Sequence, residues 1–538
     1  MDQGSDGRAT APGVELFNAA EYLLAPALDG RVDSIAVRHP GGELSYGQLL
    51  AQVRRVAAGL LGLGVRPEER VLCCMADDVE LFTAILAAMY VGAVAVPCST
   101  MLTAAELGKL VADSRARLVL GSTEFRAAVL GGVAYGEVGT VVLTGAAPAA
   151  RELPAGVSRG LTWAELLAAG GPDPVPYSSW ADSPALWLYT SGTTGMPKAA
   201  VHRHADVRYV ARTYGQQVLG IRPDDVCLSA AKLFFAYGLG NSMIFPLSVG
   251  ASTVLEPGRP APRLFADRVA EHGVTLFFGG PSFWGPMLAA PPEEVPPGAL
   301  ATVRQGVSAG ETLPPRLYHG IHERYGVEIL DGIGSTEALH IFISNRAGQV
   351  VPGSSGMPVP GYRVELRRPD ATVIEGVGEP GMLYLAGDSL CEGYWCRTVV
   401  NRAVFQGEWM RTGDQYVRNA DGSYTCLGRA DDVLKVGGIW VSPAEVEARL
   451  LEHPGILEAA VVGVPDADGL DKPVAFVVPR AGHRLEPDEV ISFCRAGLAA
   501  FKRPRAVLEL AELPKTGTGK IQRFRLRELV DAAVVTAP

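Results

Sequence analysis

The chain has 538 residues, of which 48% are hydrophobic and 20% are charged, and its formal net charge is −10. This apolar content excludes a chain that is disordered over most of its length, and the length excludes a single small binding module. The negative charge excludes nucleic-acid binding through a broad basic surface, so any anionic ligand must be held by a few locally placed cations.

The N-terminal sequence MDQGSDGRATAPG lacks the basic start and apolar stretch of a secretory signal. The eight cysteines form no CxxC pair and no Cys/His group with zinc spacing, so we expect reduced thiols in a cytoplasmic protein. The apolar run 81–98 approaches the length of a membrane span, but Gly92 and Pro97 interrupt it. It predicts a buried helix followed by a core strand, and no membrane partner.

Residues 44–145 alternate strand-length apolar runs with helical patterns. The runs predict strands at 44–49, 70–75, 93–98, 116–122 and 140–145, with helices at 48–64, 80–92 and 103–114. Alternation of this kind predicts parallel sheets covered by helices. The Ala/Pro/Gly-rich stretch 145–156 that follows predicts a surface connection.

The remaining chain changes character twice. A second βα region runs from about 183 to 331, with strands expected at 226–235, 252–257 and 274–280. From about 356, short strands punctuated by Gly and Pro predict a β-rich subdomain, with strands at 362–370, 381–387 and 423–428. A last stretch has its own pattern of helices and strands, so we expect an α/β N-terminal domain of residues 1–431 and a small α+β C-terminal domain of residues 432–538.

The segment 189–198, YTSGTTGMPK, follows the apolar run ALWLY. Its hydroxyls, its glycine backbone and the cation of Lys198 are what a loop around a triphosphate needs. It is not a Walker A loop, because two residues separate Gly195 from Lys198. The later GTGK at 517–520 also fails, because Pro514 stands where that motif has Gly. The tetrapeptide GTTG alone would fit an ordinary surface turn.

The full string resembles the phosphate-binding signature of the adenylate-forming superfamily of acyl-CoA ligases, luciferases and adenylation domains. Four further motifs follow in that family's order: DGIGSTE at 331–337, RTGD at 411–414, GRADDVLKVGG at 428–438 and PKTGTGK at 514–520. The resemblance implies an enzyme that uses ATP, Mg²⁺ and coenzyme A, and whose small C-terminal domain is mobile about a hinge at Asp431.

The resemblance also implies roles for individual residues. Lys520 would bridge the carboxylate and the α-phosphate, because two anions approach only if cations neutralise them. Glu337 would bind Mg²⁺, with Thr336 assisting at the phosphate. The implied ATP and AMP site consists of Thr190, Ser191, Gly192, Thr193, Thr194, Lys198, Ala309, Gly310, Glu311, Asp331, Asp414 and Arg429. Taken alone, each of these would also fit a solvated side chain or an ordinary turn.

Rotation of the C-terminal domain about Asp431 would move Lys520 out of the active site and bring the loop around Lys435 into its place. Gly437 and Gly438 in that loop would let the pantetheine arm of CoA pass close to the backbone. Lys502 and Arg503 resemble a family segment near the CoA entrance, where their cations would meet CoA phosphates. A solvated basic turn fits these two cations equally well.

Two stretches, 232–251 and 332–345, resemble the benzoate-type aryl-CoA ligases, in which they line the acid pocket. The matching substrate-binding positions are Ala236, Tyr237, Gly334, His340 and Ile341, together with Lys435. They imply a flat apolar slot for an aromatic ring, with His340 able to hydrogen-bond a carboxylate or a ring substituent. Ala338 stands where relatives often carry a larger residue, which predicts room for an amino or hydroxyl group. The string FFAYG alone would also fit an aromatic core strand.

We therefore expect an ATP-dependent aryl-acid:CoA ligase that adenylates benzoate, an aminobenzoate or a hydroxybenzoate and releases AMP and pyrophosphate. The alternative is a stand-alone adenylating enzyme that loads the phosphopantetheine arm of a carrier protein. A third possibility, a nucleotide-binding protein without catalysis, would need a motif residue to be missing, and none is. The expected partner is a small aromatic acid, and the expected state is a monomer or homodimer.

Overall fold

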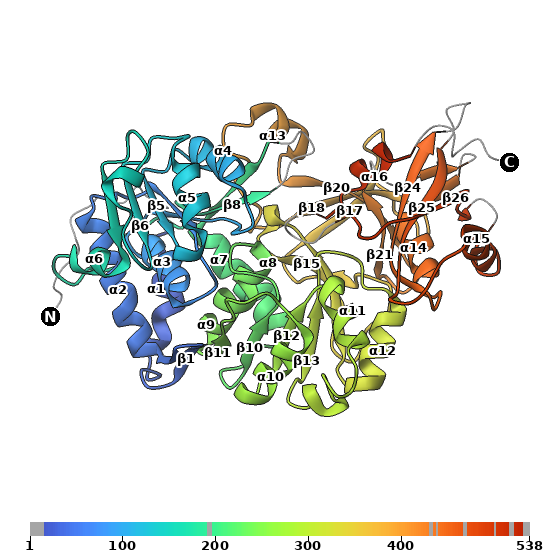
Figure 1. Cartoon of the computed structure of the whole chain (residues 1–538), viewed down its shortest axis with the longest axis horizontal. Helices are drawn as coiled ribbons and strands as arrows, with labels where there is room; N and C mark the ends of the chain where they lie inside the picture. The colour runs from blue at the N-terminus through green and yellow to red at the C-terminus, as the bar shows by residue number, and fades with distance from the viewer. Residues whose placement is uncertain are drawn as a thin grey trace. The chain divides into compact units, whose positions relative to one another are not determined.

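The computed structural model describes residues 15–190, 196–429, 434–436, 439–465, 471–499, 502–515 and 521–530. The chain forms two compact units (Figure 1). The first consists of Met1–Pro260, Ser335–His340 and Asp388–Asn401, and the second of Ala261–Gly334, Ile341–Gly387 and Arg402–Pro538. Two short segments from late in the sequence are thus built into the first unit, and both carry site residues.

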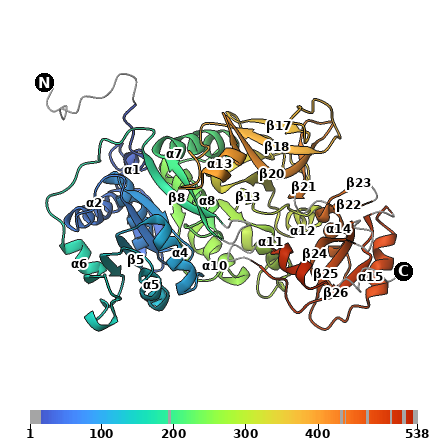
Figure 2. The same cartoon turned by 90° about the horizontal axis from the view of Figure 1, so that it is seen from above.

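The first unit contains a seven-stranded sheet with the order β7-β6-β5-β3-β4-β8-β9. Its strands are β3 (Arg70–Cys74), β4 (Val94–Pro97), β5 (Leu118–Gly121), β6 (Thr140–Leu143), β7 (Arg159–Thr162), β8 (Pro184–Thr190) and β9 (Lys198–Arg203). All neighbours pair in parallel except β8 and β9, which form an antiparallel hairpin. Helices α4 (Ala104–Ser114) and α5 (Arg126–Val133) lie beside this sheet (Figure 2), and their apolar side chains belong to one cluster with those of the sheet. The predicted helix-covered parallel sheet is confirmed.

Further elements complete the first unit. Strands β10 (Val226–Ser229), β11 (Ser252–Val254), β1 (Ile35–His39) and β2 (Gly42–Ser45) lie side by side in that order. The helices are α1 (Ala19–Leu24), α2 (Tyr46–Gly62), α3 (Val79–Tyr90), α6 (Trp163–Ala168), α7 (His204–Val210), α8 (Ala236–Leu239) and α9 (Phe245–Val249). The apolar run 81–98 forms the buried helix α3 and the buried strand β4, as predicted. Within the described part of the chain, no helix combines the length and apolar character that a membrane crossing requires.

Several predicted strands extend beyond the observed carboxyl ends, and the two largest differences are at 44–49 and 226–235. The strand expected over 44–49 stops at Ser45, whose hydroxyl accepts the Gln48 N–H while the Gln48 side chain accepts the Ser45 N–H. This capping box starts α2 at Tyr46, because it satisfies backbone donors that a helix end leaves open. The strand expected over 226–235 stops at Ser229, and FFAYG leads into helix α8 instead of forming a core strand.

The second unit contains parallel strands β12 (Leu276–Gly279), β13 (Gln305–Ser308) and β14 (Ile329–Gly334), followed by antiparallel β15 (Ile341–Ser344) and β16 (Met357–Pro358). Its helices in this part are α10 (Pro262–His272), α11 (Pro281–Ala289) and α12 (Pro315–Tyr325). The predicted β-rich part is an antiparallel sheet of β17 (Arg363–Arg367), β18 (Gly381–Ala386), β19 (Phe405–Gln406), β20 (Trp409–Arg418) and β21 (Tyr424–Arg429). Helix α13 (Thr398–Val404) precedes β19.

The C-terminal elements follow the predicted pattern. They are β22 (Leu434–Val436), β23 (Ile439–Val441), α14 (Pro443–Leu451), β24 (Ile456–Pro465), β25 (Asp471–Pro479), α15 (Pro487–Arg495), β26 (Ala506–Glu509) and α16 (Arg523–Glu528). Alternate residues of β24 enter two different apolar clusters, Val461 in one and Val462 in the other. Since successive strand residues face opposite ways, this three-stranded sheet has a core on each face. The domain boundary at Asp431 stays a prediction, because that residue lies outside the described ones.

All eight cysteines lie among the described residues, and all are free thiols. Six are buried, and burial raises the pKa of several, including Cys73 and Cys391. Buried thiols of this kind are poor nucleophiles, because the thiolate is the reactive form. That the thiols are reduced in the cell stays a prediction.

Candidate active site

The hairpin of β8 and β9 presents the predicted phosphate loop. Thr190, the last residue of β8, is the cross-strand partner of Lys198, the first residue of β9. Ser191, Gly192, Thr193 and Thr194 lie between them, outside the described residues. The loop thus connects a buried parallel strand to an edge strand, and Lys198 stands at its base.

Tyr394 connects Lys198 to Glu337. The Lys198 ammonium lies 4.4 Å from the centroid of the Tyr394 ring, and the Tyr394 hydroxyl donates a 2.7 Å hydrogen bond to Oε1 of Glu337. A cation over an aromatic face and a hydroxyl bound to a carboxylate both fix geometry. One residue that no sequence motif singled out therefore brings two predicted site residues together.

Glu337 and Thr336 lie in a short 3₁₀ turn, Thr336–Ala338, which follows β14. Ser335 caps the turn, because its hydroxyl oxygen accepts the N–H of Ala338 at 3.2 Å. Leu339 closes the turn with a φ of 66°, a left-handed conformation that is uncommon for a leucine. The turn therefore reverses the chain tightly and leaves Thr336 and Glu337 half-buried.

The donors at this turn fit the expected Mg²⁺. Mg²⁺ takes hard oxygen ligands, usually one or two from protein and the rest from phosphate and water. The Glu337 carboxylate and the Thr336 hydroxyl are donors of this type on adjacent residues. Among the residues that the structure describes, no group of three or more His, Cys, Asp or Glu side chains could hold a metal ion. The donor type at Glu337 therefore suits a Mg²⁺ that arrives with the nucleotide.

The first unit also brings His340 and Tyr237 together. Their ring centroids lie 5.4 Å apart, and the His340 ring is also packed against Tyr214 and Phe245. Nε2 of His340 lies 3.1 Å from Oδ1 of Asn241. Burial lowers the pKa of His340 to about 3, so the ring is neutral near pH 7.

Local packing dictates the residue types around His340. Ala236 is buried at the start of α8, next to Tyr237. A Cβ on Gly240 would come within 2.3 Å of Cδ2 of His340, so only glycine fits there. Gly334 and Ile341 are cross-strand partners in the second unit. That all five predicted positions line one acid pocket stays a prediction.

Four residues of the predicted ATP and AMP site lie around the carboxyl end of β13 in the second unit. Ala309, Gly310 and Glu311 follow β13, and Asp331 on β14 pairs with Ser308, the last residue of β13. Ligands of α/β sheets commonly bind at such carboxyl ends of parallel strands. Asp331 is buried, and burial raises its pKa to about 8, although the backbone N–H groups of Leu313 and Gly332 oppose the rise.

Asp414 and Arg429 pair across β20 and β21 in the second unit. Nη1 of Arg429 lies 3.0 Å from Oδ1 of Asp414 and donates to the carbonyl oxygen of Thr412, also at 3.0 Å. Gly413 has a φ of 81°, and a Cβ there would meet Nη2 of Arg429 at 2.6 Å. Glycine is therefore required for the close approach of this guanidinium. These two residues of the predicted ATP and AMP site are thus in contact with each other.

The remaining predicted residues belong to the C-terminal part. Lys520, Asp431, Gly437 and Gly438 lie outside the described residues, and Lys435 belongs to strand β22. Nζ of Lys502 lies 2.5 Å from Oε1 of Glu445, and Nε of Arg503 donates to the carbonyl oxygen of Leu498 at 3.0 Å. These contacts hold both cations on the C-terminal elements, and their contact with CoA stays a prediction.

The similarity to known proteins extends over nearly the whole chain. Residues 25–395 match the family described as AMP-binding enzyme, and residues 445–520 match the AMP-binding enzyme C-terminal domain. The chain is 42% identical to a benzoate–CoA ligase of Thauera aromatica over 532 residues, which are 97% of this chain and 98% of that protein.

Two solved structures are also similar. A benzoate CoA ligase from Burkholderia xenovorans LB400 has 41% identity and a TM-score of 0.86, covering 95% of this chain and 100% of that one. The anthranilate CoA ligase AuaEII, solved in complex with anthranoyl-AMP, has 37% identity and a TM-score of 0.88, covering 97% of this chain and 98% of that one. The likeness in sequence is therefore matched by a likeness in fold.

Proposed function

Because the chain belongs to the AMP-binding enzyme family, we infer that it is an AMP-forming ligase that joins an aryl carboxylic acid to coenzyme A. We further propose that the acid is benzoate or a benzoate with one small amino or hydroxyl substituent. The observation that carries the proposal is the full-length similarity to ligases named for benzoate and for anthranilate.

In the proposed first step, a carboxylate oxygen of the acid attacks the α-phosphorus of ATP. The bond from that phosphorus to the oxygen bridging to the β-phosphate breaks, and pyrophosphate leaves with the electron pair. Lys198 would neutralise phosphate charge, and Lys520 would hold the carboxylate against the α-phosphate. Glu337 would hold Mg²⁺, which when bound supplies positive charge that screens the phosphates, and Thr336 would assist at the phosphate. Around the nucleoside, Asp414 would accept hydrogen bonds from the ribose hydroxyls, and Arg429 would support the ribose. Asp331 would lie near adenine.

In the proposed second step, the CoA thiolate attacks the acyl carbon of the aryl-AMP anhydride. The acyl–oxygen bond breaks, AMP leaves, and a thioester forms. Rotation of the C-terminal domain about Asp431 would replace Lys520 by the Gly437–Gly438 loop between the steps. Lys502 and Arg503 would bind the CoA phosphates near the entrance of the CoA site. Lys502 would first separate from Glu445, and Arg503 from the carbonyl oxygen of Leu498.

The surroundings of His340 support a small aromatic acid. The ring is buried, neutral and packed among Tyr214, Tyr237 and Phe245, so it offers polarity without charge in an apolar setting. Ala338, buried two residues before it, has a small side chain. Both features suit a benzene ring with a compact hydrogen-bonding substituent, and neither provides a partner for a long acyl chain.

The test is a pyrophosphate-exchange and thioester assay over benzoate, the aminobenzoates, the hydroxybenzoates and hexanoate. We expect aryl-CoA and AMP from one or more benzoates, and little product from hexanoate. Lys520→Ala should lose adenylation. Absence of an aryl-CoA product from every simple benzoate would overturn the proposal.

Free CoA is the proposed acceptor. The alternative acceptor, the pantetheine arm of a carrier protein, predicts faster transfer to a phosphopantetheinylated carrier than to CoA, and the two rates can be compared directly. A cytoplasmic location and a monomeric or homodimeric state remain predictions, the second of which sedimentation measures.

A further inference from the structure

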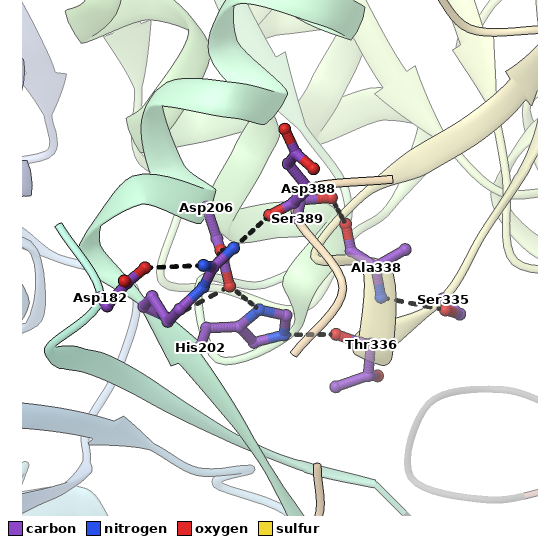
Figure 3. Close-up of polar contacts among 9 residues, drawn as sticks. Asp182, His202, Asp206, Ser335, Thr336, Ala338, Asp388 and Ser389 are labelled. Atoms are coloured by element: carbon purple, nitrogen blue, oxygen red, sulfur yellow. Dashed lines mark hydrogen bonds and ion pairs between the residues drawn. The ribbon is translucent and has the colours of Figure 1, made fainter. Parts of the chain in front are cut away.

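The turn that carries Thr336 and Glu337 is fastened at three consecutive carbonyl groups. The Thr336 carbonyl oxygen lies 2.7 Å from Nε2 of His202. The Glu337 carbonyl accepts the N–H of Cys391 at 2.8 Å, and the Ala338 carbonyl accepts the Ser389 hydroxyl at 2.8 Å. Figure 3 shows the first and third contacts. Because these peptide groups are held in place, the contacts set the directions of the Glu337 and Thr336 side chains.

His202 links the turn to a buried carboxylate. His202 and Asp206 are both fully buried, and Nδ1 of His202 lies 3.0 Å from Oδ2 of Asp206 (Figure 3). The other ring nitrogen lies 2.7 Å from the Thr336 carbonyl oxygen, so one imidazole spans the distance between the carboxylate and the turn. Breaking a buried polar link of this kind is costly, because each group then loses its partner away from water.

Arg203 secures this pair and extends it to a second segment. Its backbone N–H donates to Oδ2 of Asp206, and its Nε donates to Oδ1, both at 3.0 Å. These two donors fix the position of the Asp206 carboxylate. The same guanidinium lies 2.8 Å from Oδ1 of Asp182 and 2.5 Å from the carbonyl oxygen of Asp388 (Figure 3). Asp388 begins the segment that supplies Ser389, Cys391 and Tyr394.

We propose that His202, held by Asp206 and Arg203, is a positioning residue that orients Glu337 and Thr336 toward the metal–nucleotide complex. It acts through the Thr336 carbonyl and touches neither substrate nor metal. Because Lys198 and His202 both belong to strand β9, one strand would place the phosphate cation and the metal-binding carboxylate in a fixed relation. This inference rests on the roles proposed above for Glu337 and Thr336.

His204 is a matched control for His202. It lies two residues away, is equally buried, and its Nδ1 accepts the N–H of Ala19 at 3.0 Å. Burial lowers its pKa to about 4, so the ring is neutral near pH 7. His204 therefore has the same residue type and the same burial without the contact to Thr336.

The experiment compares His202→Gln and His204→Gln in the full-length protein. The first readout is amide hydrogen exchange in the peptide that covers residues 335–345, in the absence of ligands. We expect exchange at this turn to rise about tenfold in His202→Gln and to stay near wild type in His204→Gln, because His202 contacts the turn and His204 does not. Exchange in the β24–β25 peptides should stay unchanged in both variants.

The second readout is the Mg²⁺ concentration that gives half-maximal pyrophosphate exchange at fixed ATP. Loss of a residue that orients a metal ligand typically costs about 10-fold to 100-fold in metal affinity. We expect an increase of about tenfold in His202→Gln and less than twofold in His204→Gln. Asp206→Asn, which removes the charge and keeps the shape, should change both readouts in the direction of His202→Gln and serves if that variant does not fold.

Equal changes in the two histidine variants, or unchanged exchange at the turn in His202→Gln and Asp206→Asn, would overturn the positioning role. Glu337→Gln in the same Mg²⁺ titration separates this inference from the proposed function. If Glu337→Gln leaves the Mg²⁺ requirement unchanged while His202→Gln still loosens the turn, the metal role of Glu337 fails and His202 only stabilises the backbone. A loosened turn with a changed Mg²⁺ requirement supports the proposal.

Discussion

Two regions that the enzyme is proposed to use on the same nucleotide are built in different ways. The turn at Thr336 and Glu337, in the first unit, is fastened by His202 and by two further groups, and His202 and Asp206 are fully buried. In the second unit, Asp414 and Arg429 pair with each other, and their side chains are 17% and 51% exposed. In the turn, groups of the protein hold the carbonyl oxygens, which a nucleotide has no need to contact. In the second region, a ribose hydroxyl can compete with Arg429 for the Asp414 carboxylate.

The difference has an energetic consequence. Each hydrogen bond contributes about 0.5–1.5 kcal/mol and three of them hold the turn, whereas a partly exposed ion pair such as Asp414–Arg429 contributes about 0–1 kcal/mol. Reorienting the turn would therefore cost more than opening the Asp414–Arg429 pair. We infer that the turn region is built for fixed geometry at the reacting phosphate and that the Asp414 region is built for exchange of the nucleotide.

The largest effect is expected from Glu337→Gln. The amide keeps the size of the side chain but loses the anionic oxygens that Mg²⁺ requires, so the pyrophosphate-exchange rate should fall on the order of 100-fold at fixed Mg²⁺. The melting temperature should change little, because the backbone contacts of the turn remain. Glu379→Gln, at a carboxylate 44% exposed and paired with Arg368, is the control. Equal rates in the two variants would remove Glu337 from the reaction.

Asp414→Asn should act on affinity. Loss of the charge weakens the hydrogen bonds to the ribose, so the KM for ATP should rise about tenfold, which corresponds to about 1.4 kcal/mol. The kcat should stay within about twofold of wild type, because the turn at Glu337 is unaffected. A fall in kcat larger than the rise in KM would mean that this region also fixes the reacting geometry, and the contrast between the two regions would fail.

Local sequence signals predicted the parts of the fold that depend on local order. Apolar periodicity located β3, β4, β5 and β6 of the parallel sheet but missed β7, and the motif around Lys198 placed its loop at the end of a buried strand. For the strand expected over 44–49, a local signal was present and overlooked. Ser45 and Gln48 have the spacing of a capping box, which would have ended the strand at Ser45 and started α2 there.

The contacts around Glu337 could not be predicted in this way. His202 lies 134 residues before Thr336, and Tyr394 lies 57 residues after Glu337. Periodicity and capping report on neighbours in sequence, whereas these contacts depend on how separate segments are built into one unit. The only sequence-level signal for Tyr394 is that a half-buried carboxylate needs a hydrogen-bond donor, which does not identify the donor.

Tyr394→Phe tests whether the fixed geometry depends on this distant residue. It removes the hydroxyl from Glu337 and keeps the ring beside Lys198, so only one hydrogen bond is lost. A loss of about 1 kcal/mol predicts a fall in kcat of about fivefold. In a double-mutant cycle with Glu337→Gln, the effect of Tyr394→Phe should shrink, since its partner is already altered. Independent effects would show that the hydroxyl acts elsewhere.

The smallest effects are expected from pH, and they have opposite signs in the two units. In the first unit, burial lowers the pKa of His204 to about 4 from 6.5. Its contribution to stability is present above pH 6.5 and is lost as the pH falls toward 4, because the unfolded state then binds the proton first. In the second unit, burial raises the pKa of Asp331 to about 8 from 3.8. Its contribution is present below pH 4 and is lost as the pH rises toward 8.

Thermal unfolding of the ligand-free enzyme between pH 5 and 8 measures both effects. His204→Gln should lose less stability than wild type on going from pH 7 to pH 5, by about 2–4 °C in Tm, because no buried imidazole has to be charged. Asp331→Asn should lose less stability than wild type between pH 5 and pH 8, because no buried carboxyl resists ionisation. His204→Gln should change the stability loss toward low pH, and Asp331→Asn the loss toward high pH. If both variants changed the loss at the same end of the pH range, the opposite pH dependence assigned to the two buried groups would be contradicted. The contrast between the units would then rest on His202 and Asp414 alone.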